Sequence, residues 1–199
     1  MFKSQGFQIL REVVPIEVAG FLEDYAKMRA NVCADLEPFD NRLCWGTLHD
    51  KQMPGTWGCY ADSASEVLLN GLLDAASDVS GVDLVPTYSY LRVYKPQDEL
   101  TPHTDREECP VSATVNLGGD PWPIHIKDRA GGAHEVLLSA GDALVYAGEE
   151  LEHWRHPFEG HSCTQVFLHY SSNANIAYDS RLGLGYPLDA GRFLKVIRS

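Results

Sequence analysis

The sequence predicts a mainly β protein with flanking helices, of the sandwich or jelly-roll kind. Short apolar segments follow one another in its second half, at residues 111–117, 123–127, 134–138 and 143–146, and Gly, Asp or Pro bounds each of them. Short strands closed by such turn residues are typical of antiparallel β folds. The first half instead contains two stretches in which apolar residues recur with the period of an amphipathic helix. We therefore expect helices that support a β core.

The length of the chain favours one domain. It has 199 residues, enough to bury a real core, so a single domain over 1–199 is expected. We divide it into N-terminal supporting helices and a loop (1–84), a jelly-roll core (85–171) and a C-terminal extension (172–199). Its 44% hydrophobic and 22% charged residues are ordinary for a folded globular protein.

Charge and cysteine content exclude several classes of protein. The formal net charge of −12 opposes binding to a phosphate backbone, so no nucleic-acid partner is expected. No apolar run approaches the length of a membrane span, and the first residues lack the apolar segment of a signal peptide. The five cysteines show no paired spacing, which argues against a disulfide framework or a zinc ribbon. We expect a cytoplasmic protein with reduced thiols and no membrane partner.

The N-terminal part predicts a strand and a helix before an irregular region. Residues 6–14 have the composition of a strand, and Pro15 suits the first turn of a helix over 15–30. Residues 31–61 contain scattered Gly, Pro and aromatic residues that break any period. They predict either a packed surface loop or a loop that covers a substrate.

A second helix is expected after this region. Ser63 and Glu66 have the spacing of a capping box, in which two side chains satisfy free backbone amides at a helix start. Apolar residues then recur with a helical period until Gly81, where the helix should end. We assign a supporting role to both helices.

The β core begins near Val85 with a strand that has two unlike faces. One face is small or apolar, and the other carries polar aromatic and basic side chains. The first consists of Ser89, Leu91 and Val93, and the second of Tyr88, Tyr90, Arg92 and Tyr94. We expect the apolar face to meet the helices and the polar face to point into the barrel. Inward polar groups need partners, which are either a bound ligand or one another.

Three residues of the core have the character of metal ligands. His103 and Asp105 are two residues apart in an extended segment, so their side chains point to one side. His153 follows 50 residues later, just after the strand-like run that ends at Tyr146. Two histidines and one carboxylate form the facial triad of non-haem Fe(II) oxygenases, which leaves open positions on the metal. His-x-Asp alone is a common pattern, but its place among the strands favours a ligand role.

The remaining histidines offer alternatives. His156 and His161 lie close to His153 in sequence and compete with it for the third ligand position. His125 alternates with two isoleucines, so it faces opposite them and is a candidate to line the pocket. The others are expected at the surface, in loops or in a structural role: His49, His134 and His169.

Five ordered segments resemble a known family. They are Tyr94-x-x-x-x-x-Leu-x-x-His-x-Asp105, Trp122-Pro-Ile-His-Ile, Gly141-Asp-Ala-Leu-Val-Tyr, Glu152-His-Trp-Arg-x-Pro-Phe-x-Gly and Gln165-Val-Phe-Leu-His-Tyr170. The set, which covers residues 85 to 171, is similar to the Fe(II)/2-oxoglutarate-dependent dioxygenase superfamily, and to its small prolyl-hydroxylase-like bacterial and phage-type branch in particular. The resemblance implies a double-stranded β-helix, the cupin-like form of the jelly roll.

The resemblance also implies the cofactors. Fe(II) would lie on His103, Asp105 and His153, because the family places its second histidine directly after the strand and turn that end near Gly148. 2-Oxoglutarate would chelate the iron as co-substrate, and O2 would take the last position. Halogenases of this superfamily have a small residue in place of the carboxylate ligand, so Asp105 favours hydroxylation.

The binding site for the distal carboxylate of 2-oxoglutarate departs from the family pattern. The family places a basic residue some way after the distal histidine, where this chain has residues 162–165 without Arg or Lys. Arg155 shares the face of His153 on a strand, so we predict that it pairs with this carboxylate, with Tyr94 as a hydrogen-bond partner. Arg92, on the Tyr94 face of its own strand, is the alternative.

Together these features predict a 2-oxoglutarate-dependent hydroxylase. It would act on an unactivated C–H of an amino acid, a peptide or protein residue, or a natural-product intermediate, so a small-molecule or peptide partner is expected. The alternative is a non-hydroxylating, cupin-like metal-binding protein, such as a sensor or an isomerase, although such sites usually add ligands around a His-x-His core that this sequence lacks. The acidic charge argues against a nucleic-acid dealkylase.

Overall fold

The computed structural model describes residues 2–36 and 46–176, and its strands form two antiparallel sheets. The larger sheet has six strands in the order β1-β8-β5-β10-β3-β2, and the smaller has four in the order β4-β9-β6-β7. In chain order the strands are β1 (Phe7–Leu10), β2 (Trp57–Tyr60), β3 (Val85–Tyr94), β4 (Leu100–His103), β5 (Val111–Gly119), β6 (Ile124–Lys127), β7 (Ala133–Val136), β8 (Ala143–Tyr146), β9 (His153–Arg155) and β10 (Cys163–Ser171).

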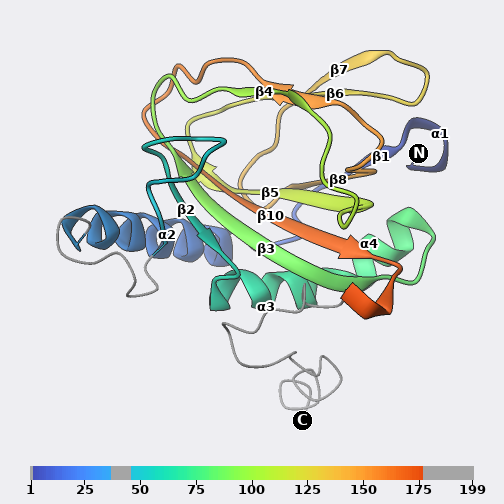
Figure 1. The fold of residues 1–199 in the computed structure, drawn as a ribbon, viewed down its shortest axis with the longest axis horizontal. Coiled ribbons are helices and arrows are strands. Elements are labelled where there is room, and N and C mark those ends of the chain that lie inside the picture. Colours follow the sequence, from blue (N-terminus) through green and yellow to red (C-terminus); the bar gives the residue numbers. More distant parts are fainter. Residues whose placement is uncertain (1, 37–45, 177–199) are drawn as a thin grey trace, which may run out of the picture.

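Helices cover one face of the larger sheet, and the smaller sheet lies across its other face (Figure 1). The helices are α1 (Phe2–Gln5), α2 (Ile16–Leu36), α3 (Ser63–Gly71) and α4 (Leu73–Ser80). α2 contacts β3 and β5, and α3 contacts β3 and β10. The predicted mainly β architecture with flanking helices is confirmed.

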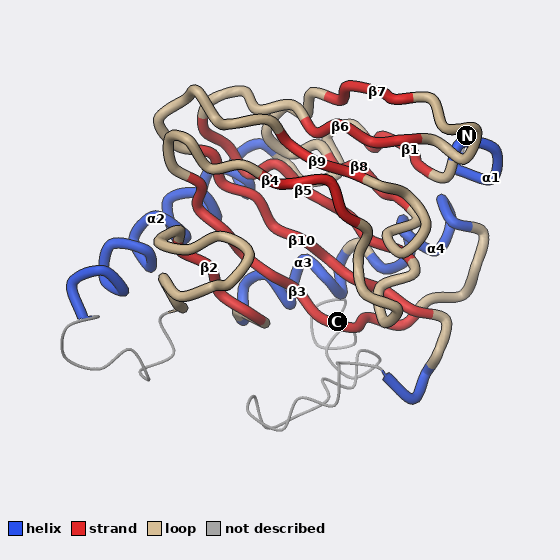
Figure 2. Tube along the Cα trace, turned by 45° about the horizontal axis from the view of Figure 1, so that its top comes forward, coloured by secondary structure: helices blue, strands red, loops and turns tan. Residues whose placement is uncertain are grey.

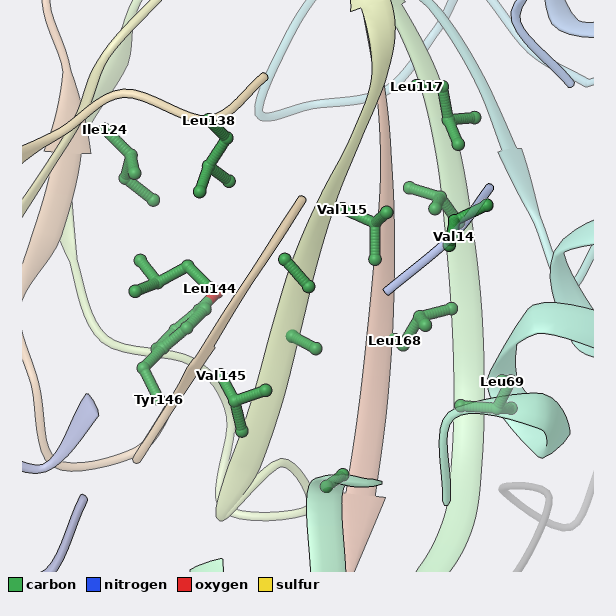
Figure 3. Close-up of a cluster of buried hydrophobic side chains, with 14 of the residues drawn as sticks. Val14, Leu69, Val115, Leu117, Ile124, Leu138, Leu144, Val145, Tyr146 and Leu168 are labelled. Carbon is green, nitrogen blue, oxygen red and sulfur yellow. The ribbon is translucent and has the colours of Figure 1, made fainter. Parts of the chain in front are cut away.

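The strands of the larger sheet have an apolar outer face and a polar inner face. On β5 the buried residues Ala113, Val115 and Leu117 alternate with buried polar residues. Figure 3 shows Val115 and Leu168 near Leu69 of α3, with which they belong to one apolar cluster. The alternate polar residues face the smaller sheet, so the space between the sheets can hold a polar site.

The helices differ in extent from those predicted. α2 continues to Leu36 because residues 31–36 contain no Gly or Pro that would end it. The second predicted helix is divided at Leu72 into α3 and α4, and α4 ends at Gly81, whose left-handed conformation is typical of a helix end.

The predicted capping box is wrong. Asp62, rather than Ser63, caps α3, because its side chain accepts hydrogen bonds from two backbone amides of the first turn. The Glu66 carboxylate is buried against β3, where it accepts hydrogen bonds from the backbone amide and the hydroxyl of Ser89. The helix start is therefore satisfied by one side chain, and the second carboxylate ties the helix to the sheet.

The region 31–61 is less irregular than predicted. Its first residues belong to α2, and Trp57–Tyr60 form β2, the edge strand beside β3. Residues 37–45 lie outside the described residues, as do residues 177–199, which make up most of the predicted C-terminal extension at 172–199.

No helix in the described part of the chain is both long and apolar enough to span a membrane.

The smaller sheet positions the two histidines of the predicted metal site. β4 is drawn above β3 and β10 in both views (Figures 1 and 2), and Figure 2 shows β9 beside β4. Their pairing sets His103 opposite His153 and Leu100 opposite Arg155, with a register irregularity between the two pairs on the β4 side. Within β9, His153 and Arg155 are buried and Trp154 is partly exposed, so the expected alternation holds.

Candidate metal centre

Three potential metal ligands meet where β4 and β9 pair. One donor atom from each of His103, Asp105 and His153 lies within 4.8 Å of the others. The rings of His103, the last residue of β4, and His153, the first of β9, have centroids 4.3 Å apart. Asp105 follows in the next loop, with its Oδ1 3.7 Å from Nε2 of His153. The structure brings together the three residues that the sequence predicted as ligands, and metal binding by them stays a prediction.

Backbone carbonyls orient both imidazoles. Nδ1 of His103 lies 2.9 Å from the carbonyl oxygen of Thr101, and Nδ1 of His153 lies 2.9 Å from that of Leu151. A carbonyl oxygen only accepts hydrogen bonds, so each Nδ1 carries the proton and each Nε2 presents a lone pair. Metal-binding histidines are usually held in this way.

Asp105 is held both at its backbone and at its carboxylate. The backbone amide of Asp105 donates to the carbonyl of Gly148 over 2.8 Å, and the Ser112 hydroxyl donates to Oδ2 of Asp105 over 2.5 Å. A Cβ at position 148 would lie 2.5 Å from that Oδ2 and 2.5 Å from Oγ of Ser112. A glycine is therefore required where the turn after β8 passes the carboxylate.

The protonation states suit metal binding. Burial alone would raise the pKa of Asp105, but His169, His153 and the Ser112 hydrogen bond lower it overall. Burial lowers the pKa of His153, and the neighbouring Asp105 offsets this only in part. At neutral pH the carboxylate is thus ionised and the imidazole neutral, which are the forms that coordinate metals.

The three residues line a cavity of about 440 Å³ between the sheets. Its wall includes the face of β3 that carries Tyr88, Tyr90, Arg92 and Tyr94, so the predicted inward orientation of these side chains is confirmed. The volume falls within the range of small-molecule binding sites.

The loop before β2 supplies a second part of the cavity wall. Asp50 and Gln52 line the cavity, and both accept hydrogen bonds from the guanidinium of Arg92, over 2.5 and 3.3 Å. The Tyr90 hydroxyl also donates to Asp50, over 2.6 Å. Two roles were open for residues 31–61, a packed surface loop or a loop that covers a substrate, and the position of these two residues at the cavity favours the second. Their place at the cavity could not be predicted, because isolated polar residues in an irregular segment do not indicate which strand they will contact.

Arg155 is a buried cation without an acidic partner. Its side chain is 1% exposed, and its guanidinium donates to the carbonyl of Trp122 and, over 3.5 Å, to Oε1 of Gln165. Its Nε has no hydrogen-bond partner, and no carboxylate of the described residues pairs with it. Burial lowers the pKa of Arg155. A guanidinium nevertheless stays protonated in proteins, so this charge lacks a counter-ion.

Tyr94 connects Arg155 to the cavity. The Tyr94 side chain lines the cavity, whereas Arg155 does not border it directly. The Tyr94 hydroxyl is buried without a hydrogen-bond partner within normal distance. Burial raises the pKa of Tyr94, and the nearby guanidinium groups of Arg92 and Arg155 offset this only in part. By contrast, Arg92 borders the cavity but already pairs with Asp50. The two predicted candidates for carboxylate binding therefore differ in whether their charge is neutralised.

The alternative third ligand lies elsewhere. His156 is exposed on the outer side of the smaller sheet, with its ring centroid 4.6 Å from that of His125. His125 stacks on Trp154 over 5.4 Å, so its suggested place in the pocket is wrong. The isoleucines beside it, Ile124 and Ile126, are the inward residues of β6. His161 is exposed as well.

Two further residues at the site were not predicted. Oγ of Ser112 lies 2.9 Å from Nδ1 of His169, which lines the cavity and stacks on Tyr88. His169 had been assigned a purely structural role. Strand alternation shows which neighbours share a face, but contact between β5 and β10 depends on a register that the sequence does not display.

Known structures share this fold. A prolyl-4-hydroxylase from Pseudomonas putida superposes with a TM-score of 0.66 at 16% identity, over 87% of this chain and 96% of that one. The non-haem, α-ketoglutarate-dependent epimerase SnoN from nogalamycin biosynthesis gives 0.66 at 16% identity, over 94% and 89%. HygX from Streptomyces hygroscopicus, with nickel and 2-oxoglutarate bound, gives 0.60 at 16% identity, over 87% and 85%.

Other comparisons found nothing: no protein-family model and no curated protein matches the chain. The structural likeness confirms the fold that the resemblance in sequence implied. The chain has the double-stranded β-helix fold, which it shares with this prolyl-4-hydroxylase, SnoN and HygX.

Proposed function

We propose that this chain is a Fe(II)- and 2-oxoglutarate-dependent oxygenase that hydroxylates a C–H bond of a small polar molecule or of a single exposed side chain. One observation carries the proposal: the His103, Asp105 and His153 cluster is held by backbone and side-chain hydrogen bonds and faces a cavity. Nitrogen and carboxylate donors in a two-to-one set, with space on one side, suit non-haem Fe(II).

The chain's residues also fit a 2-oxo diacid. Among the described residues, the buried guanidinium of Arg155 has no counter-ion, and the Tyr94 hydroxyl beside the cavity has no hydrogen-bond partner. Buried polar and charged groups are costly unless they are paired, so this end of the site is complete only with an anion. Tyr94 and Arg155 would hold the distal carboxylate, and the three metal ligands would hold the iron.

When bound, Fe(II) with 2-oxoglutarate and O2 supplies the oxidising power, at the cost of decarboxylating the co-substrate to succinate. The chain contributes position and a dry environment. Leu100 and Phe167 line the cavity, and the buried Trp122 packs edge-on against Tyr94, which also lines it. These apolar surfaces limit the access of water, which strengthens electrostatic contacts with the bound groups.

The size of the cavity limits the substrate. About 440 Å³ must accommodate both the co-substrate and the reacting part of the second substrate. Asp50, Gln52 and Tyr60 give the outer wall hydrogen-bonding groups, which suits a polar molecule such as an amino acid, a peptide residue or a natural-product intermediate. SnoN and HygX have been determined with nogalamycin RO and hygromycin B, respectively, so this fold accepts small molecules in those proteins.

Succinate release tests the proposal. Protein loaded anaerobically with Fe(II) is mixed with 2-oxoglutarate, O2 and a panel of amino acids, short peptides and polar natural products. We expect succinate above the substrate-free level with at least one class, and a product that has gained one oxygen atom by mass. Asp105→Ala protein should give neither.

The same assay separates the alternatives. Succinate with a product of unchanged mass would favour epimerisation, the activity for which SnoN is named. Metal and 2-oxoglutarate binding without succinate from any panel member would contradict oxygenase activity and favour a sensor or an isomerase.

A further inference from the structure

A row of four side chains crosses the larger sheet beneath Asp105. The strand registers place Ser112 of β5 opposite Tyr146 of β8 and opposite His169 of β10, and place His169 opposite Tyr88 of β3. Residues directly opposite one another in antiparallel strands share a face, so all four face the smaller sheet. Within this row the Ser112 hydroxyl hydrogen-bonds to Asp105, and the Tyr146 hydroxyl lies 3.5 Å from Nε2 of His153.

The direction of the hydrogen bonds follows from their chemistry. The Ser112 hydroxyl donates its single hydrogen to Oδ2 of Asp105 over 2.5 Å. Ser112 then has only its lone pairs left for His169, whose Nδ1 lies 2.9 Å away and must donate. The chain therefore runs from the His169 imidazole through Ser112 to Asp105.

This arrangement makes the two oxygens of Asp105 different. Oδ1 is directed toward the other ligands, 3.7 Å from Nε2 of His153. Oδ2 is held by Ser112 and lies against Gly148, where even a Cβ would not fit. A hydrogen bond between an ionised acceptor and a hydroxyl at this distance is of the strong, charge-assisted kind.

We propose that Ser112 is a positioning residue that keeps Asp105 a one-oxygen ligand of the metal. This inference rests on the proposed function, because it assumes that the three residues bind a metal. A carboxylate can coordinate through one oxygen or both. With Oδ2 engaged by Ser112, Asp105 would offer only Oδ1 to the metal. The remaining coordination positions would then be free for a 2-oxo acid, which chelates through two oxygens.

Loss of the hydroxyl has a defined consequence. In Ser112→Ala the Oδ2 atom has no hydroxyl partner, and the carboxylate is released to turn both oxygens to the metal. A position needed by the 2-oxo acid is then taken by the protein. Outer hydrogen-bond partners of metal ligands are typically worth about 10- to 100-fold in metal affinity or activity.

Co(II) in place of Fe(II) reports this directly. Its visible absorption depends on the number and arrangement of ligands, and no turnover is needed. We expect wild-type Co(II) protein to change its spectrum when 2-oxoglutarate is added. Ser112→Ala should start from a different spectrum and should need about 10- to 100-fold more 2-oxoglutarate for the same change. Ser112→Cys, with a weaker donor of similar size, should be intermediate and serves if the alanine variant does not fold.

Thr114→Val is the matched control. Thr114 lies two residues further on the same face of β5, is equally buried, and donates its hydroxyl to Gln165 over 3.2 Å rather than to a ligand. A merely structural role for Ser112 predicts that both variants lower the melting temperature and that both keep the wild-type Co(II) spectrum. Our inference predicts that only the Ser112 variants change the spectrum.

The outcomes separate this inference from the proposed function. A wild-type protein that does not bind Co(II), or whose spectrum ignores 2-oxoglutarate, overturns the metal site itself. A wild-type response that persists unchanged in Ser112→Ala, or that is lost equally in Thr114→Val, overturns the role of Ser112 and leaves the metal site standing.

Discussion

The cavity has two ends that differ in how their polar atoms are satisfied. At the metal end, His103, His153 and Asp105 each have a hydrogen-bond partner that fixes their orientation. At the inner end, the Tyr94 hydroxyl and Nε of Arg155 have none, and the Arg155 charge has no acidic partner in the described residues. The polar groups of the first end are satisfied within the protein, whereas those of the second are the ones that we propose a ligand satisfies.

Arg92 differs from Arg155 in the direction in which its pKa is shifted. Burial alone would lower its pKa, but Tyr94 and the carboxylate of Asp50 raise it overall. Burial prevails for Arg155, which faces aromatic rings and a thiol instead of a carboxylate. Two buried arginines near one cavity thus differ in kind: one charge is neutralised within the protein, and the other is available to a bound anion.

The largest effect should come from the metal end. His153→Ala removes a ligand whose partners are in place, so we expect Ni(II) or Co(II) binding, measured by calorimetry, to fall by more than about a hundredfold, beyond what outer-shell changes cost. His156→Ala, three residues away and exposed, is the control and should bind as wild type. Loss of binding in His156→Ala with normal binding in His153→Ala would assign the third ligand to the wrong histidine.

The inner end should respond in 2-oxoglutarate affinity rather than in metal affinity. Truncating one partner of a buried ion pair typically costs ~3–5 kcal/mol. At about 1.4 kcal/mol per tenfold, Arg155→Ala should raise the 2-oxoglutarate Kd at least about a hundredfold, with metal binding intact. Arg92→Ala should act mainly on the second substrate. Normal 2-oxoglutarate affinity in Arg155→Ala, with the loss found in Arg92→Ala, would move the carboxylate site to β3.

Gly148→Ala disturbs the metal end without touching a ligand. The added methyl would meet Oδ2 of Asp105 and Oγ of Ser112 at 2.5 Å, so the carboxylate must shift. We expect metal affinity to fall about 10- to 100-fold, as for other changes around metal ligands. Gly20→Ala in α2, where no atom lies within 4 Å of the new Cβ, is the control for a general effect of the substitution. Equal metal affinity in both variants would show that Asp105 is not held in this way.

Tyr94→Phe should have the smallest effect, and one that depends on the ligand. With Arg155 retained, loss of one hydrogen bond to a charged group, ~1.5 kcal/mol, should weaken 2-oxoglutarate binding about tenfold. The ligand-free variant should be no less stable to thermal unfolding, because the hydroxyl that is removed has no partner. A destabilised ligand-free protein with unchanged 2-oxoglutarate affinity would mean that this hydroxyl serves the fold instead.

The local sequence pattern predicted that His103, Asp105 and His153 lie close together, as the structure shows. His103 and Asp105 are two residues apart, and β9 keeps His153 and Arg155 on one face, so alternation sufficed once the strands were recognised. The same rule failed for His125, because alternation sets it opposite Ile124 and Ile126 without saying which side is inward. The isoleucines took the inner side, since their burial is the more favourable.

The remaining residues of the site depend on contacts between distant segments. Ser112 reaches Asp105 and His169 through the registers of β5, β8 and β10, and Asp50 reaches Arg92 across 42 residues of sequence. Neither contact can be recognised from the periodicity of apolar residues in the sequence. The predicted capping box is wrong for a related reason. The Glu66 carboxylate accepts a hydrogen bond from Ser89 of β3, which is distant in sequence, instead of from the start of its own helix. Motif spacing thus identified the three residues that the structure brings together, and tertiary structure was needed to identify the side chains that hold them.

The central claim is that a metal at one end of the cavity and a buried cation at the other together bind 2-oxoglutarate. Calorimetric titration of Ni(II)-loaded and metal-free protein with 2-oxoglutarate and with glutarate tests it directly, since glutarate keeps both carboxylates but lacks the chelating oxo group. We predict tight binding of 2-oxoglutarate to the Ni(II) protein alone, and much weaker binding of glutarate to either form. Equal affinity of 2-oxoglutarate for both forms, or equal affinity of the two diacids for the Ni(II) protein, would contradict the claim.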